Sequence, residues 1–275
     1  MASWFAGLPP VAGVRAADGP PVDAMVSLRM ADVSEASCPL RQVQGRQMVT
    51  AVPWRKAGSA RGQAHYPGYF WSATTGGHVI YESRLELARL LLADFDRDVT
   101  AITAQPFLLQ ARVVGTARRH VPDFLLVHAD KSVRVVNVKP AGKLAEPRIA
   151  EALAWPGQLI EGHGWQYEIW SGADPVLLAN LRFLAGYRRP GLLPEQLLDY
   201  VLAAVRPGDT IGGVISQMPR IRRPDAVKAA VLGLLWQQRL ATDLHTHLDA
   251  ESTLEVNAAA ARRSRLLAVH PARLG

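Results

Sequence analysis

The chain has 275 residues, a formal net charge of +7 and 49% hydrophobic residues. This length fits one large domain or two unequal ones, and no apolar run reaches the roughly 18 to 20 residues that a membrane-spanning helix requires. Cys38 is the single cysteine, which excludes an internal disulfide and a multi-cysteine zinc cluster.

Residues 1–45 show no sustained periodicity and carry two Pro-Pro pairs, at 9–10 and 20–21. This pattern predicts a flexible leader. The first forty residues hold no basic segment followed by an apolar one, as a secretory signal would. The sequence therefore favours a cytoplasmic protein with no membrane association.

Residues 46–189 are predicted to form one α/β domain. Aromatic and β-branched runs at 68–72 and 78–81 flank a Thr-Thr-Gly-Gly turn, which indicates a hairpin. Ser83 then precedes apolar positions at helical spacing, with Glu86 three residues later as in a capping box, so a helix is predicted over 83–93. Further strands are predicted at 105–114, 121–127, 133–138 and 165–170, and helices at 144–161, interrupted at Pro156-Gly157, and at 177–187. One sheet flanked by helices results.

The Arg188-Arg189-Pro190-Gly191 segment predicts a boundary, because a Pro-Gly pair breaks regular structure. Residues 190–257 then read as three helices, at 194–205, 210–217 and 224–240, and a short hairpin of 240–244 with 253–256. This order predicts a winged-helix domain. Its third helix would normally read a major groove, but the same fold also docks proteins, and the sequence leaves both open. The Ala/Arg-rich tail at 258–275 is expected to fray.

Three polar residues mark the ends of two predicted strands. Asp123 follows Pro122 at the start of one strand, and Asn137 and Lys139 lie two apart on the next, so their side chains share a face. If the strands pair as a hairpin, Asp123 lies near the end that holds Lys139. Each residue alone is explained by a turn cap or a solvated strand end; the combination is that of a hydrolytic centre. Lysine occurs only five times in a chain otherwise rich in arginine, and only lysine can supply a compact, tunable ammonium group.

Glu86 is the candidate for a further carboxylate. It lies deeper in the amphipathic pattern of its helix than Glu82, with which it shares a face. The structural alternative is an exposed ion pair with Arg89, three residues further on, worth a few tenths of a kcal/mol.

The chain resembles the TnsA endonuclease subunits of heteromeric transposases, which belong to the restriction-endonuclease-like, PD-(D/E)XK class. The resemblance covers roughly residues 65–175 and rests on four segments in order. These are Ser83-Arg84-Leu85-Glu86-Leu87, Gln105-Pro106-Phe107-Leu108, Pro122-Asp123-Phe124-Leu125 and Asn137-Val138-Lys139-Pro140. It implies a restriction-endonuclease-like mixed sheet flanked by helices, with a winged helix behind it. The family has glutamine two residues before the lysine, where this chain has Asn137, which is shorter but equally uncharged.

The resemblance implies a Mg²⁺-dependent endodeoxyribonuclease, with Mn²⁺ as the alternative ion. Its catalytic set would be Glu86, Asp123, Asn137 and Lys139, and its metal ligands would be Glu86, Asp123, Asn137 and the carbonyl of Val138. Lys139 would orient or deprotonate the attacking water. The implied partners are DNA, a DDE-type transposase that cuts the other strand, and an AAA+ ATPase regulator.

Two other functions fit the same residues. The chain could be a stand-alone defence or restriction-type nuclease, or a non-catalytic DNA- or protein-binding module that keeps a nuclease fold, and Asn137 keeps the second open. The net charge of +7 favours a polyanionic partner, although arginines spread over solvated faces explain it equally well. Arg118, Arg119 and His120 are the predicted phosphate contacts. His245 and His247 fall in the predicted wing and are not expected to bind a metal.

Overall fold

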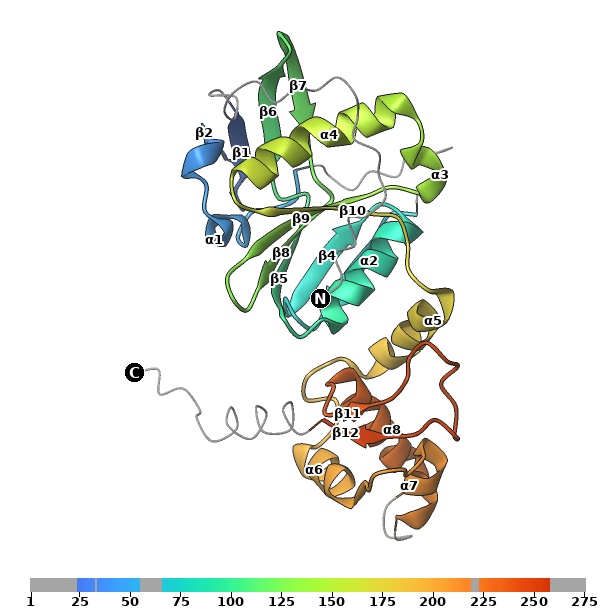
Figure 1. Ribbon diagram of the computed structural model, residues 1–275. Coiled ribbons are helices and arrows are strands. Elements are labelled where there is room, and N and C mark those ends of the chain that lie inside the picture. Colours follow the sequence, from blue (N-terminus) through green and yellow to red (C-terminus); the bar gives the residue numbers. More distant parts are fainter. Residues whose placement is uncertain (1–23, 33, 55–65, 219–222, 258–275) are drawn as a thin grey trace, which may run out of the picture. The chain divides into compact units, whose positions relative to one another are not determined.

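The computed structural model describes residues 24–32, 34–54, 66–218 and 223–257 (Figure 1). The chain divides into two compact units, Met1–Gly172 and Ala173–Gly275. The division lies before the predicted boundary at 189/190, so the helix predicted at 177–187 belongs with the C-terminal unit. The expected tail at 258–275 and most of the expected leader lie outside the described residues.

The first sheet of the N-terminal unit has four antiparallel strands in the order β2-β1-β6-β7. They are β1 (Met25–Arg29), β2 (Glu35–Pro39), β6 (Leu108–Val113) and β7 (Thr116–His120). The short helices η1 (Leu40–Gln42) and α1 (Gly45–Met48) follow β2. The prediction of a flexible leader is therefore wrong for residues 24–45. Val26 and Leu28 are buried and β1 pairs with β6, so this segment contributes to the core through long-range pairing that local periodicity cannot reveal.

The second sheet is mixed, with the order β10-β9-β8-β5. Its strands are β5 (Val99–Ala104), β8 (Phe124–His128), β9 (Val133–Val138) and β10 (Gln166–Trp170). β8 and β9 form the predicted antiparallel hairpin, and β10 runs parallel to β9. A helical connection, α3 (Ala141–Leu144) and α4 (Pro147–Gly162), joins that parallel pair, as parallel strands require. The expectation of one sheet is corrected: the unit has two four-stranded sheets and a separate two-stranded one. β6 and β8 are consecutive in the expected block but lie in different sheets.

Helix α2 (Arg84–Phe95) and helix α4 cover the second sheet. Leu125 and Val135 belong to the core cluster that includes Trp155 and Ile160 of α4. The alternate residues of the same strands face the other way, toward α2, because successive side chains of a strand point to opposite faces. Figure 1 shows the two helices on either side of this sheet. The structure is thus a mixed α/β fold with antiparallel pairing flanked by helices.

The predicted hairpin before α2 is confirmed as β3 (Gly68–Ser72) paired with β4 (Gly77–Tyr81). Asp94 near the end of α2 fixes its turn, because its buried carboxylate accepts hydrogen bonds from the Ser72 hydroxyl and the backbone N–H groups of Ala73 and Thr74. The hairpin and the helix therefore form one packed substructure.

Helix α4 is continuous, so the predicted interruption at Pro156-Gly157 is wrong. The Tyr167 hydroxyl donates to the carbonyl of Leu153, which ties this turn of the helix to β10 beside Pro156. Gly157 lets the helix approach β10, since a Cβ atom there would lie 2.9 Å from the Tyr167 ring. Tertiary packing thus overrides the local breaking signal.

The C-terminal unit is helical with a small antiparallel sheet. Its elements are α5 (Pro175–Leu184), η2 (Ala185–Tyr187), α6 (Glu195–Ala204), α7 (Ile211–Gln217), α8 (Pro224–Trp236), β11 (Leu240–Ala241) and β12 (Glu255–Val256). The predicted hairpin is shortened to two residues on each side, and Thr210 adds an antiparallel bridge to Thr253. None of the described helices is long and apolar enough to cross a membrane.

Candidate active site

A cleft of about 590 Å³ opens beside the ends of β8 and β9 in the N-terminal unit. Its walls come from the start of α2, the end of β7, the first half of α4 and the segments around Asp123 and Asn137. The polar residues that line it are Glu82, Ser83, Glu86, His120, Asp123, Asn137 and Lys139, and Val138 lines it as well. All four residues of the predicted catalytic set therefore meet in one cleft.

Asp123 is held by the strands on both sides of it. Its N–H donates to the carbonyl of Val136 at 3.1 Å and its carbonyl accepts from Gln105 N at 2.8 Å. Its side chain turns toward β9, where carboxylate Oδ2 accepts from the Val138 N–H at 2.7 Å. The predicted proximity of Asp123 to the Lys139 end of the hairpin is confirmed, and the carboxylate has a fixed position.

Asn137 is almost entirely buried, with 2% of its surface exposed. Its Oδ1 lies 2.8 Å from Nε2 of His120, and its Nδ2 has no hydrogen-bond partner. The His120 ring in turn packs edge-on against Trp155, with ring centroids 6.0 Å apart and planes at 82°. The amide oxygen of Asn137 is thus hydrogen-bonded to an imidazole, and its amide nitrogen has no hydrogen-bond partner.

Glu86 combines a capping role with a place in the cleft. Its Oε2 accepts from Glu82 N at 2.7 Å and its Oε1 from the Ser83 hydroxyl at 3.0 Å, while its own N–H donates to Ser83 Oγ. Burial above all, together with the nearby carboxylates of Asp123 and Glu82, raises the pKa of Glu86 to about 7 against the lowering effect of these hydrogen bonds. The carboxylates of Glu86 and Asp123 are therefore close enough to repel each other.

Lys139 follows β9 and is only partly exposed. Its backbone N–H donates to Trp170 O at 2.9 Å, which anchors its position beside β10. Its ammonium group makes no hydrogen bond or ion pair with any residue in the described ranges. The ammonium group of this half-buried lysine can therefore donate hydrogen bonds to a molecule bound in the cleft.

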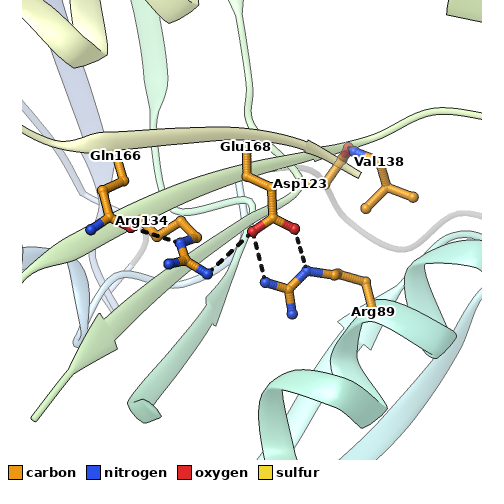
Figure 2. Close-up of polar contacts among 6 residues, drawn as sticks. All are labelled: Arg89, Asp123, Arg134, Val138, Gln166 and Glu168. Atoms are coloured by element: carbon orange, nitrogen blue, oxygen red, sulfur yellow. Dashed lines mark hydrogen bonds and ion pairs between the residues drawn. The ribbon is translucent and has the colours of Figure 1, made fainter. Parts of the chain in front are cut away.

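The ion pair considered between Glu86 and Arg89 does not form. Arg89 is buried instead against Glu168 of β10, with Nε–Oε1 at 2.7 Å and Nη2–Oε2 at 3.0 Å, and Arg134 approaches the same carboxylate at 3.5 Å (Figure 2). This bidentate pair links α2 to the sheet that carries Asn137 and Lys139. It fixes the helix on which Glu86 lies.

The three predicted phosphate contacts separate in the structure. Arg118 and His120 lie on one face of β7 and Arg119 on the other, because side chains alternate along a strand. Arg118 forms an ion pair with Glu151 of α4, and His120 faces the cleft. Only Arg119 is an exposed arginine of the kind predicted.

Gln105 is a site residue whose role the sequence does not reveal. It is buried in a left-handed conformation, with φ of 46°, which is unusual for a residue other than glycine. Its side-chain amide donates to Glu82 Oε1 at 2.9 Å and its N–H to the carbonyl of Asp123. It therefore links two walls of the cleft, and such local strain is typical of functional sites.

The cleft suits a cation that needs few protein ligands. Across the described part of the chain, no group of three or more His, Cys, Asp or Glu side chains is arranged to hold a metal ion, and this includes His245 and His247. The cleft offers the mutually repelling carboxylates of Glu86 and Asp123 and the amide of Asn137, beside a third carboxylate, that of Glu82, which accepts from Gln105. These oxygen donors fit Mg²⁺, which uses one or two carboxylates and keeps several waters, and do not fit a structural zinc ion.

Neither the models of known protein families nor the curated proteins give a match to this chain.

Proposed function

We propose that the N-terminal unit is a Mg²⁺-dependent DNA endonuclease of the restriction-endonuclease-like class, similar to the TnsA subunits of heteromeric transposases. The observation that carries the proposal is the meeting of Glu86, Asp123, Asn137 and Lys139 in one cleft. They come from three separated segments in the order of the family motif, with Asn137 where the family has glutamine.

The chemistry follows from the donor set. Glu86, Asp123 and Asn137, with the carbonyl of Val138, would hold Mg²⁺, which supplies charge neutralisation at the phosphate and a more acidic bound water. The Val138 N–H fixes Asp123, and the Glu82 N–H and Ser83 hydroxyl fix Glu86, so both carboxylates are placed before any ligand arrives. Lys139 would hold the attacking water by hydrogen bonding or take its proton.

The C-terminal unit is proposed to be a winged helix, on the basis of the order α6, α7, α8, β11, β12 and the bridge between Thr210 and Thr253. The exposed residues of α8 are Pro224, Asp225 and Lys228, all near its start, and every residue from Ala230 to Trp236 is buried. This burial leaves little of the helix to enter a major groove and favours protein docking. A DDE-type transposase and an AAA+ ATPase regulator are the proposed partners.

The test is a nicking assay on supercoiled DNA with Mg²⁺ or Mn²⁺, with the full chain alone and with transposase partners added. Asp123→Ala and Lys139→Ala are expected to lower the nicking rate at least 100-fold while both variants stay folded, which circular dichroism checks. Asp123→Ala should also lower the thermal unfolding midpoint, because it removes the acceptor of the Val138 N–H. Asp130→Asn and Lys131→Gln, at the opposite end of the β8–β9 hairpin, are matched controls that should retain full activity.

The outcomes separate the three functions. Cleavage of transposon ends that requires the partners supports the TnsA-like role, whereas efficient cleavage without partners indicates a stand-alone defence or restriction-type nuclease. DNA binding with no cleavage under any of these conditions indicates a binding module. Full activity in Asp123→Ala or Lys139→Ala would overturn the assignment of the site.

A further inference from the structure

His120 and Asn137 come from different sheets and meet side chain to side chain in the cleft. His120 is the last residue of β7, and Asn137 is the second-last residue of β9. The Nε2–Oδ1 distance of 2.8 Å is that of a good hydrogen bond. The contact of the ring with Trp155 holds the imidazole from a second direction. The imidazole is therefore a rigid partner for the amide.

The Asn137 amide is not arranged for stability. Its Nδ2 is buried and has no partner, and a buried donor without a partner costs on the order of 1 to 3 kcal/mol. An apolar residue of similar size would avoid this cost, and the neighbouring buried positions of β9 are valines. A buried polar group that is incompletely bonded requires an explanation, and function is one.

We propose that His120 is a positioning residue that fixes the Asn137 side chain and so presents its amide oxygen to a divalent cation held with Glu86 and Asp123. This inference rests on the proposed function. A carbonyl oxygen has two lone pairs, so it can accept a hydrogen bond from His120 and still bind a cation. Partners of metal ligands orient those ligands, and their loss typically weakens metal binding 10- to 100-fold.

An amide needs such a partner more than a carboxylate does. It presents a single oxygen to a cation, and rotation about its terminal bond by half a turn would put a nitrogen in that place. A carboxylate has two equivalent oxygens and loses nothing by the same rotation. The departure at Asn137 and the presence of His120 beside it are thus two parts of one arrangement.

The test measures Mn²⁺ binding to the full chain by calorimetric titration, without DNA and without turnover. His120→Phe keeps a ring against Trp155 but removes the hydrogen bond, and it is expected to weaken Mn²⁺ binding 10- to 100-fold. His120→Gln, which can still hydrogen-bond, should retain binding within a few-fold of the wild type. If the Phe variant folds poorly, His120→Met preserves the apolar contact and serves the same comparison.

A double-variant cycle shows whether His120 acts through Asn137. Asn137→Ala should weaken Mn²⁺ binding, and adding His120→Phe to it should cause no further loss. His163→Phe is the matched control, because His163 also bonds an oxygen through Nε2, Val43 O at 3.1 Å, and packs edge-on against a tryptophan, Trp165, away from the cleft. Its Mn²⁺ affinity should equal that of the wild type.

Two outcomes overturn the inference alone: unchanged Mn²⁺ binding in His120→Phe, or losses in the two single variants that add fully in the double variant. A wild-type chain that binds no Mn²⁺ even at millimolar concentration overturns the proposed function, and this inference with it. The two failures are therefore distinguishable in the same set of titrations.

Discussion

Two buried asparagines, one in each unit, show how differently the same side chain is used. Asn180 on α5 donates from Nδ2 to the carbonyls of Leu244 and Thr246, and its Oδ1 accepts from Leu248 N. The side chain of Asn137 makes one hydrogen bond, to His120, and leaves its Nδ2 without a partner. The first amide organises the loop between β11 and β12. The second lines a cleft among charged groups and leaves a buried donor without a partner.

The largest effect expected from this comparison is the loss of stability in Asn180→Ala. The change leaves three backbone groups without their partner, and solvent can replace only part of this bonding, so a cost of about 2 kcal/mol is expected. Urea denaturation of the full chain, together with hydrogen exchange of residues 242–252, measures it. Asn180→Asp places a carboxylate oxygen against the carbonyls of Leu244 and Thr246, so it should be at least as destabilising as Asn180→Ala. The comparison fails if Asn180→Ala is no more destabilising than Asn137→Ala.

The contrast also explains which parts of the site could be predicted from the sequence. Asp123 and Lys139 were predictable because a hairpin brings its own two ends together, and the capping pattern of Ser83 and Glu86 is local. The contact of His120 with Asn137 could not be predicted, since it joins two sheets. The sequence of β7, TARRH, lacks the alternation of apolar and polar residues that would predict a strand.

The same limit applies to the fold. The hairpin of β3 and β4, helix α2 and the order of elements in the C-terminal unit follow from local patterns, and the structure has them within a few residues. β1 was missed because its burial depends on pairing with β6, about 80 residues later in the chain, and β2, which is largely exposed, is placed by its pairing with β1. The left-handed conformation of Gln105 could not be predicted, because contacts with Glu82, Asp123 and Trp54 from three separate segments hold it.

A smaller effect is expected from pH, and it tests whether the cleft is built to be completed by a cation. The folded-state pKa of Glu86, about 7, lies above its ordinary value of 4.5. Without divalent cations the folded chain therefore holds an extra proton between these values. Its free energy of unfolding should fall as pH rises through that window, by about 1 kcal/mol after allowance for solvent screening in the cleft.

Glu86→Gln should remove this pH dependence, because an amide does not titrate, while it keeps a polar group for the cap. Mg²⁺ should raise the unfolding midpoint of the wild type more at pH 8 than at pH 5.5, since only ionised Glu86 can bind it, and should leave Glu86→Gln little changed. Urea denaturation across pH 5 to 8, with and without Mg²⁺, gives both quantities. Identical pH profiles for the wild type and the variant would show that Glu86 stays ionised throughout.

The smallest change in stability is expected where the loss of function is largest. Asn137→Leu replaces an incompletely bonded amide by an apolar side chain of similar size, so the free energy of unfolding should stay the same or rise by up to about 1 kcal/mol. The increase in unfolding midpoint caused by Mn²⁺ should disappear.

Leu126→Asn is the control, because it introduces an amide at a buried position of the adjacent strand, away from the cleft. It should lower the free energy of unfolding by about 2 kcal/mol or more, because nothing there compensates for the burial of the amide. A strongly destabilised Asn137→Leu that still responds to Mn²⁺ would assign Asn137 the structural role that Asn180 has. A residue that can be replaced without loss of stability, but not without loss of cation binding, is retained for the site and not for the fold.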